Sequence, residues 1–267
     1  PTAVIGQIVV DAPDEAAPLN PQFVSGESVP GTGLTLLGYN LGRETMAPGQ
    51  EILLTLFWQR GADPAADSFD LQLVDDGGET AQSWRLPVTR ADYALPGWQP
   101  GPPLRGQCLL RFRGGLDSGS YEFLLQDEVS AGQIAVDAPD RTFDTPEMAV
   151  VVKQMFGDHI ELAGYSLAME PLQLELIWSA NDEVAKNYHV FVHLVDENGQ
   201  IVAQTDGQPA NWTRPTTGWA PGEYIADAHA LTLPQGLSID NLRLRVGLYD
   251  PDSGERLPVD GSDFATL

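Results

Sequence analysis

The sequence predicts an all-β protein made of two antiparallel β-sandwiches in tandem. Three observations lead to this prediction: a segment that occurs twice, apolar residues that alternate with polar ones, and turn residues between the short apolar runs. Residues 6–13 read GQIVVDAP and residues 132–139 read GQIAVDAP. A repeat at this distance indicates a duplicated domain.

Further landmarks recur in the same order in both halves of the chain. These are a Gly-Tyr pair, a strand-like run that ends in tryptophan, a Leu-Val-Asp run and a G-W-x-P-G loop. In this order they are found at Gly38, Trp58, Asp75 and Trp98 in the first half, and at Gly164, Trp178, Asp196 and Trp219 in the second half. We therefore predict a diverged first repeat over 1–145 and a second repeat over 146–267. The strand at 132–136 closes the first sandwich or opens the second, and the sequence leaves this open.

The apolar residues follow a period of two. Leu172, Leu174, Leu176 and Trp178 alternate with polar neighbours over one segment, and Leu242, Leu244, Val246 and Leu248 do so over another. Alternation of this kind is typical of a strand with one buried and one wet face. No window of helical length has apolar residues at helical spacing.

Turn residues separate these runs. The chain has 27 glycines and 21 prolines, and Asp-Gly-type clusters occur at 75–78, 196–199 and 252–254. Such residues tolerate positive φ and favour hairpins. Many short strands at this spacing predict immunoglobulin-like or jelly-roll-like sandwiches of roughly seven to nine strands each.

Composition narrows the partners. The formal net charge is −24, and Lys153 and Lys186 are the only lysines. Nucleic acid and anionic membrane surfaces both need a basic face, so we expect neither as a direct partner. An acidic chain indicates a solvated surface in an extracytoplasmic or saline setting, or alternatively a surface that binds cations.

The single cysteine excludes an intrachain disulfide. Cys108 lies in an apolar run, and we expect it to act as a small buried hydrophobe. No apolar run has the length of a membrane-spanning helix, and no signal peptide is visible. Because the chain starts at Pro1 rather than Met, we expect it to come from a longer protein.

Five strings in the second half carry a resemblance to a known class of modules. They are FGDHIELAGY (156–165), YHVFVHLVD (188–196), AQTDGQP (203–209), RPTTGWAPGE (214–223) and VGLYDPDSGERLP (246–258). In this order they resemble β-sandwich modules that follow the membrane-spanning part of large bacterial membrane proteins, notably of the Chloroflexi type. Many of those proteins are similar to family-39 glycosyltransferases, the polyprenyl-phosphate-dependent mannosyltransferase class.

The resemblance implies an extracytoplasmic fragment of a membrane-anchored protein, in which any transferase chemistry lies in an upstream membrane portion. It covers residues 156–267. The first half departs from it, since it has FDLQ (69–72) where the second half has VFVH (190–193). The modules carry no activity that could be transferred to this chain.

Polar residues found only in the second copy are the first candidates for a site. His193, Asp206, Asp227 and His229 are two histidines and two aspartates that a metal could use in principle. His189 and His193 share a strand face but lie about 13 Å apart at the strand rise, so they cannot bind one ion together. We predict no metal site and no cofactor.

Catalytic motifs are also missing from the sequence. It has no G-x-S-x-G, no phosphate loop, no H-E-x-x-H and no C-x-x-C. Most acids fall in predicted turns, where they do not form the carboxylate pair that a glycosidase needs. We therefore do not expect an enzyme, and we keep a hydrolase of unknown type as a third hypothesis.

Tryptophans are the residues that a sugar-binding module would use. Trp58 and Trp178 end matched strands, so we expect them in the cores. Trp212 and Trp84 occur in one copy each and are the first candidate stacking residues, with Arg214 beside Trp212 as a polar partner. Trp219 lies in the loop that is matched by the loop of Trp98, so it is either a loop anchor or a further stacking residue. The leading hypothesis is a non-catalytic spacer or interaction region that contacts carbohydrate or another cell-surface protein. The alternative is a carbohydrate-binding module that uses exposed tryptophans.

Overall fold

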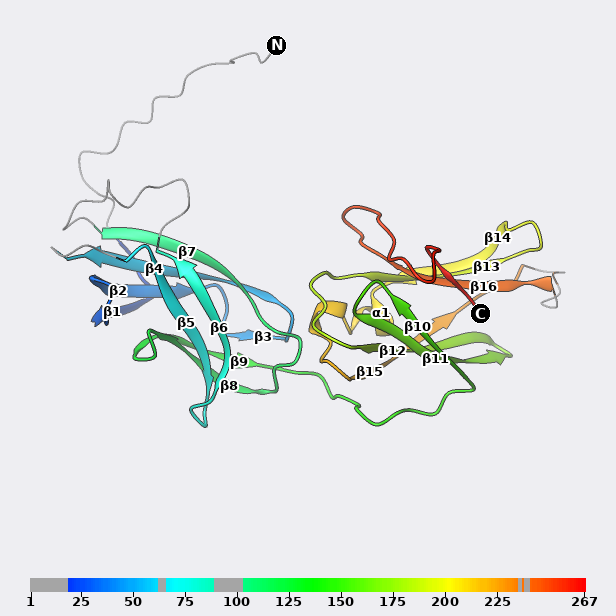
Figure 1. Ribbon diagram of the computed structural model, residues 1–267, viewed down its shortest axis with the longest axis horizontal. Helices are drawn as coiled ribbons and strands as arrows, with labels where there is room; N and C mark the ends of the chain where they lie inside the picture. The colour runs from blue at the N-terminus through cyan, green and yellow to red at the C-terminus, as the bar shows by residue number, and fades with distance from the viewer. Residues whose placement is uncertain (1–18, 62–65, 89–102, 235–236, 238–240) are drawn as a thin grey trace, which may run out of the picture. The chain divides into compact units, whose positions relative to one another are not determined.

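The computed structural model describes residues 19–61, 66–88, 103–234, 237 and 241–267. Over these residues the chain is almost entirely β, which confirms the all-β prediction. Figure 1 shows its strands gathered into several sheets. The repeated strand expected at residues 6–10 and the loop tryptophan Trp98 lie outside the described residues.

In the described part of the chain, the first sandwich has nine strands in two sheets, with the orders β1-β2-β4-β7 and β3-β9-β8-β5-β6. The strands are β1 (Phe23–Val29), β2 (Leu34–Leu41), β3 (Thr45–Met46), β4 (Glu51–Arg60), β5 (Ser68–Asp75), β6 (Thr80–Pro87), β7 (Pro103–Arg111), β8 (Gly119–Leu125) and β9 (Val129–Val136). Trp58 on β4 packs against Phe69 on β5 with ring centroids 5.3 Å apart, so side chains of the two sheets meet in one core.

The second sandwich contains eight strands, in the orders β10-β11-β12-β15 and β14-β13-β16-β17. The strands are β10 (Val150–Phe156), β11 (Ile160–Met169), β12 (Leu172–Ala180), β13 (His189–Val195), β14 (Ile201–Gly207), β15 (Tyr224–Ala230), β16 (Arg243–Tyr249) and β17 (Ala265–Thr266). Between β14 and β15 lie a short helical segment, α1 (Pro209–Trp212), and a 3-10 turn at Thr216–Gly218.

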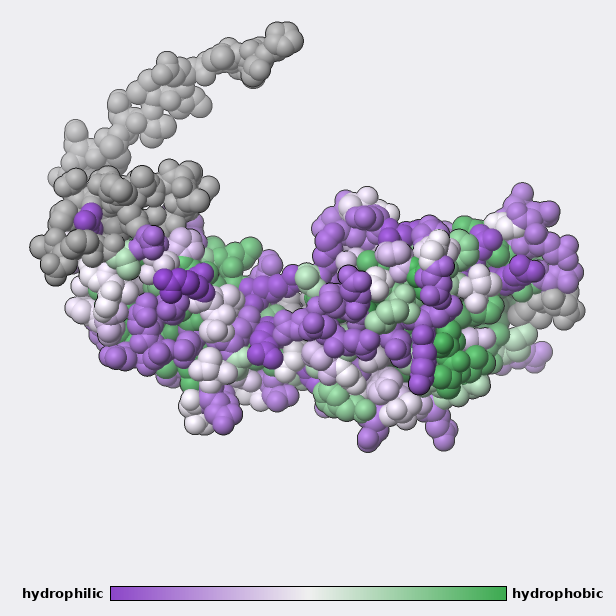
Figure 2. Space-filling model, in the orientation of Figure 1, coloured by the Kyte–Doolittle hydropathy of each residue, from purple (hydrophilic) through white to green (hydrophobic). Residues whose placement is uncertain are grey.

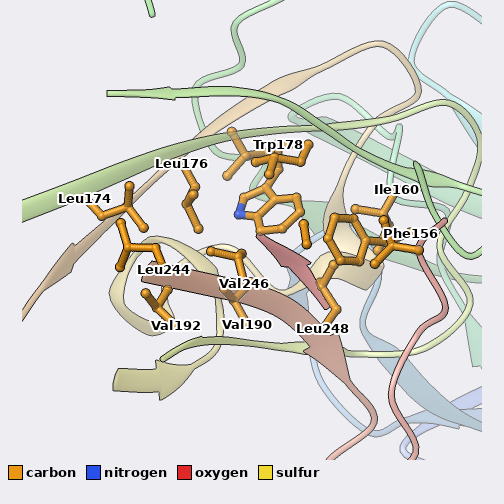
Figure 3. Packing of buried hydrophobic residues seen from close by; sticks show 14 of the residues in the cluster. Phe156, Ile160, Leu174, Leu176, Trp178, Val190, Val192, Leu244, Val246 and Leu248 are labelled. Atoms are coloured by element: carbon orange, nitrogen blue, oxygen red, sulfur yellow. The ribbon is translucent and has the colours of Figure 1, made fainter. Parts of the chain in front are cut away.

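The core of the second sandwich follows the predicted alternation. In Figure 3, Leu174, Leu176 and Trp178 on β12 face the valines and leucines of β13 and β16. Trp178 is completely buried, and its ring meets that of Phe156 edge-on at 5.5 Å. Since each residue buried here contributes about 1.5–3 kcal/mol, the inward set holds the two sheets together.

The Gly-Tyr landmarks coincide with matching β-bulges. The β2–β4 register slips between Leu36 and Gly38, and the β11–β12 register slips between Leu162 and Gly164. A Cβ atom on either glycine would lie 2.3 Å from a backbone oxygen of the adjacent edge strand, so only glycine fits. Shared irregularities of this kind are what a duplication predicts, and the duplication itself stays our inference.

The predicted hairpin turns are present and are built alike. The Oδ1 atoms of Asp75 and Asp196 each accept two backbone N–H bonds, at 2.9 and 2.8 Å in both turns. Gly78 and Gly199 then supply φ of 82° and 79°, which a residue with a side chain rarely adopts.

The repeated strand at 132–136 belongs to β9, which is hydrogen-bonded between β3 and β8 and therefore completes a sheet of the first sandwich. The chain divides into two compact units, one of Pro1–Gly42, Leu53–Leu109 and Glu122–Gln133 and one of Arg43–Ile52, Leu110–Tyr121 and Ile134–Leu267. Each unit consists of three separate segments of the chain, so this division does not test a boundary at residue 145, which stays a prediction.

Two smaller expectations concern burial and membrane spans. Cys108 is 7% exposed, and burial raises the pKa of its thiol to about 11, so it is a packed side chain rather than a nucleophile. Within the described ranges, no helix combines the length and the apolar character that a membrane span requires.

Candidate functional site

The outer face of the sheet β14-β13-β16-β17 carries an unusual set of side chains. Val190, Val192 and Leu194 on β13 point into the core, so His189, Phe191 and His193 point outward. Their cross-strand neighbours are Asp206 and Gln204 on β14 and Tyr249, Gly247 and Arg245 on β16. The sheet register thus gathers aromatic and polar residues from three strands on one face.

The aromatic side chains of this face contact one another in a continuous row. Ring centroids are 5.1 Å apart for Trp212–His189, 5.5 Å for His189–Tyr249, 6.4 Å for Tyr249–Phe191 and 4.7 Å for Phe191–His193. We call these five residues the aromatic row. The first two contacts are edge-to-face, an arrangement that aromatic rings favour.

Trp212 forms the exposed end of the aromatic row. Its side chain is 59% exposed, an unusual fraction for a tryptophan. A Cβ atom placed on Gly207 would lie 3.0–3.2 Å from Nε1, Cε2 and Cζ2 of the indole, so this edge of the ring packs closely on the glycine. Much of the rest of the indole remains accessible.

The backbone that presents Trp212 is strained. Ala210, Asn211 and Trp212 have φ of 52°, 52° and 70°, three consecutive left-handed residues without a glycine among them. This conformation costs about 1–2 kcal/mol for each such residue. Strain of this kind persists only where surrounding contacts impose it, and such positions cluster at functional sites.

Asp227 supplies the contact that holds this turn. Its side chain is buried, and its Oδ1 accepts a 2.8 Å bond from the backbone N–H of Ala210. Its Oδ2 lies 2.8 Å from Nε2 of His229 and accepts a 3.2 Å bond from Nε1 of Trp178. Asp227 thus connects the Trp212 turn to the core of the second sandwich.

The first sandwich lacks this arrangement. Its equivalent of Asp227 is Gly106, whose added Cβ would lie 3.1 Å from Nε1 of Trp58. That indole nitrogen is buried and has no hydrogen-bond partner among the described residues. Asp227 and His229 are therefore specific to the second sandwich because they position the turn.

A polar pocket of about 250 Å³ adjoins the aromatic row. It is lined by Phe191, His193, Gln204, Thr205, Asp206, Tyr249, Gly254 and Arg256. The hydroxyl of Tyr249 donates a 2.7 Å hydrogen bond to Asp206. Burial and then the Asp206 carboxylate raise the pKa of Tyr249 to about 12, so the phenol stays protonated and serves as a donor.

Two further groups set the electrostatics of the pocket. The guanidinium of Arg256 lies 4.4 Å from the centroid of the Phe191 ring and pairs with Asp263 at 2.9 Å. The pKa of His193 is lowered, first by burial and then by the charge of Arg256. At neutral pH its imidazole is uncharged and can both donate and accept a hydrogen bond.

The residues predicted from the sequence separate into exposed and buried ones. Trp212 has the exposure that a stacking residue needs. Trp219 does not: it is completely buried, and its Nε1 donates to the backbone oxygen of Arg214 at 3.0 Å, so its assignment to a stacking platform was wrong. Trp84 is half-buried, with its ring centroid 6.4 Å from that of the core residue Phe123, so its role as a stacking residue stays a prediction.

Arg214 also has a structural position. It pairs with Glu223, which is fully buried and also pairs with Arg141 at 3.4 Å. The side chains of Arg214 and Arg141 are only 15% and 7% exposed. Because its guanidinium is held in this buried cluster, Arg214 is not available as the polar partner of a ligand on Trp212.

Sequence reasoning missed most of the pocket. His189, Phe191 and His193 occupy the outward positions of a strand, where polar or small residues are usual. Ring-bearing residues at every second position were therefore the signal that the sequence offered. Gln204, Tyr249 and Arg256 carried no signal, since their adjacency depends on strand order. Among the described residues, no group of three or more His, Cys, Asp or Glu is arranged to hold a metal ion.

Comparisons with known proteins yield a general likeness only. No family model and no curated protein matches the chain. One similar solved structure is the trypsin-activated alpha-2-macroglobulin of Escherichia coli, at 11% identity and a TM-score of 0.28, with 91% of this chain and 16% of that chain covered. Another is a glycosyl hydrolase family 2 member from Bacteroides cellulosilyticus DSM 14838, at 12% identity and a TM-score of 0.25, with 90% and 30% covered. The chain thus spans less than a third of either protein, and TM-scores this low carry no argument about function.

Proposed function

We propose that this chain is a non-catalytic carbohydrate-binding β-sandwich region and that the second sandwich carries the binding site. The observation that supports this most is Trp212, which is 59% exposed and packs on Gly207, next in sequence to Asp206 of a polar pocket. The apolar face of a pyranose ring packs on such an indole, and hydroxyl groups are bound by polar side chains beside it.

The energetic cost of presenting Trp212 also supports this function. Three left-handed residues hold the indole away from the core, and a buried carboxylate is used to keep them there. A turn with no binding role would gain stability by relaxing, or by a glycine at one of these positions. A role in ligand binding accounts for keeping the strain.

The proposed setting is the bacterial cell surface. The five strings of the second half resemble modules downstream of membrane-spanning regions, and the net charge of −24 suits an extracytoplasmic surface. In this proposal the region is part of a larger membrane-anchored protein, one similar to a glycosyltransferase, and contacts the membrane only through an upstream segment. It binds no nucleic acid.

A second candidate function is a spacer that contacts another cell-surface protein. Val150 and Val151 lie on the edge strand β10 and are 42% and 61% exposed. Figure 2 shows hydrophobic side chains gathered over the region of β10 and β11. Exposed apolar residues on a strand with a free edge favour contact with a partner protein.

The test is binding of the whole chain to a broad glycan array, with Trp212→Ala and Phe143→Ala run in parallel. Phe143 is a matched control because it is 57% exposed and lies outside the aromatic row. We expect specific binding that is lost in Trp212→Ala and kept in Phe143→Ala. An array without any signal, or equal loss in both variants, would favour the spacer function.

A further inference from the structure

Resting on the proposed function, we infer that the ligand is a neutral glycan of at least two contiguous sugar units. One unit stacks on the exposed indole of Trp212, and the next enters the pocket lined by Asp206, Gln204 and Arg256. Three features of this face support a ligand of this kind. The indole of Trp212, which we call the platform, adjoins the pocket, the pocket lining has hydrogen-bonding groups without a partner among the described residues, and its charge suits a neutral sugar.

The platform and the pocket are neighbours on the same sheet face. Gly207, on which the Trp212 indole packs, directly follows Asp206, which lines the pocket. The ring of His189 contacts both Trp212 and Tyr249, and Tyr249 also lines the pocket. A ligand on the indole therefore has the pocket beside it along the direction of the aromatic row.

The size of the pocket limits it to one sugar unit. Its volume of about 250 Å³ is smaller than the roughly 300–1,000 Å³ of sites that enclose drug-sized ligands. Trp212 does not line it. A glycan that uses both features must therefore place one unit in the pocket and another outside it on the indole.

The lining offers hydrogen-bonding groups of both kinds. The side chains of His193, Gln204 and Thr205 make no hydrogen bond with the described residues. Asp206 accepts one bond, from Tyr249 to Oδ2, which leaves Oδ1 open. Arg256 bonds Asp263 through Nη1, which leaves its other guanidinium donors open. Adjacent sugar hydroxyls, each a donor and an acceptor, match this mixture.

The charge of the lining favours a neutral sugar. The pocket holds one guanidinium, Arg256, and one carboxylate, Asp206, while His193 is the remaining titratable base. Because Arg256 already pairs with Asp263 at 2.9 Å, the Asp206 carboxylate is not compensated by it, and the chain as a whole carries −24. A uronate, a sialate or a phosphorylated sugar would meet the Asp206 carboxylate and a repulsive overall field, whereas a neutral unit meets neither.

The test uses immobilised neutral oligosaccharides of increasing length beside uronate- and sialate-containing ones, followed by calorimetric titration of the best binder and its single unit. The variants are Asp206→Asn and Gln204→Ala in the pocket, Trp212→Ala on the platform, and Phe143→Ala as the control. We expect neutral chains of two or more units to bind about tenfold or more tightly than one unit, with about a tenfold loss in each site variant.

The outcomes separate this inference from the proposed function. Trp212-dependent binding confined to acidic glycans, or a single unit that binds as tightly as its longer chain, would keep the carbohydrate-binding function and overturn the neutral two-unit ligand. Binding that is lost with Trp212→Ala but unchanged with Asp206→Asn and Gln204→Ala would remove the pocket from the site. Absence of binding to every glycan would overturn both proposals.

Discussion

Asp227→Asn removes the charge that holds the Trp212 turn while keeping the size of the side chain. The carboxylate now receives three donors: the backbone N–H of Ala210, Nε1 of Trp178 and Nε2 of His229, which carries the proton of this contact because a carboxylate only accepts. An asparagine offers one oxygen and one NH₂ group in the same place. Either orientation sets the NH₂ against a fixed N–H, from Ala210 or from Trp178.

The expected cost follows from this count. A hydrogen bond to a charged group contributes about 1.5–3 kcal/mol, and a buried donor left without a partner costs about 1–3 kcal/mol. We therefore expect Asp227→Asn to lower the free energy of unfolding by about 2–4 kcal/mol. If the freed donor is that of Ala210, the left-handed turn relaxes, and glycan affinity falls more than the loss of stability alone explains.

Urea unfolding followed by tryptophan fluorescence measures the first effect, and titration with the best-binding glycan measures the second. Asp206→Asn is the matched control for the unfolding measurement, since Asp206 is exposed and an asparagine there still accepts the Tyr249 hydroxyl. It should change stability by no more than about 0.5 kcal/mol. Unfolding of Asp227→Asn within that same margin of wild type would refute the role given to Asp227.

Three other predictions concern packing and charge. Gly247→Ala would place a Cβ 2.4 Å from the Phe191 ring, so it should cost about 1–3 kcal/mol in urea unfolding; wild-type stability would contradict the packing. Glu223→Ala removes the carboxylate that pairs with two buried arginines, so it should lower the free energy of unfolding by about 3–5 kcal/mol in the same measurement. A loss below about 1 kcal/mol would contradict this. The hydrogen bond from Lys186, followed by one from a backbone N–H, lowers the pKa of Asp250 to about 2. The ionised Asp250 side chain therefore stabilises the fold above the unfolded-state pKa near 4, and this stabilisation is lost as pH falls through about 2. The stability difference between wild type and Asp250→Asn should shrink steadily over that window, and a difference at pH 2 as large as the one at pH 7 would contradict it.

The strands could be predicted because their signals are local. Alternation along 172–178 and 242–248 depends only on the residues themselves, and the aspartates at 75 and 196 make the hairpin turns through their own nearby N–H groups. The Gly-Tyr landmarks were visible in the sequence, but their cause was not, because the bulge exists only once an edge strand is placed on the glycine.

The site could be predicted only in part because it depends on strand order. Trp212 was identified from its polar loop, and its exposure agrees. Trp219 lies in a loop that is matched by the loop of Trp98, which favoured an anchoring role, and its ring is indeed buried. The function of Asp227 was not visible either, since its partners come from β12 and from a turn whose φ values the sequence does not reveal.

A binding site at Trp212 can be observed by titrating the ¹⁵N-labelled chain with a neutral oligosaccharide that binds on the array and following the indole N–H signals of its six tryptophans. Trp212→Phe assigns the signal of interest. The account predicts that the Trp212 signal shifts saturably while those of Trp58, Trp178 and Trp219, which are buried, stay in place. A bound glycan that leaves the Trp212 signal unchanged would contradict a binding site on this face of the second sandwich.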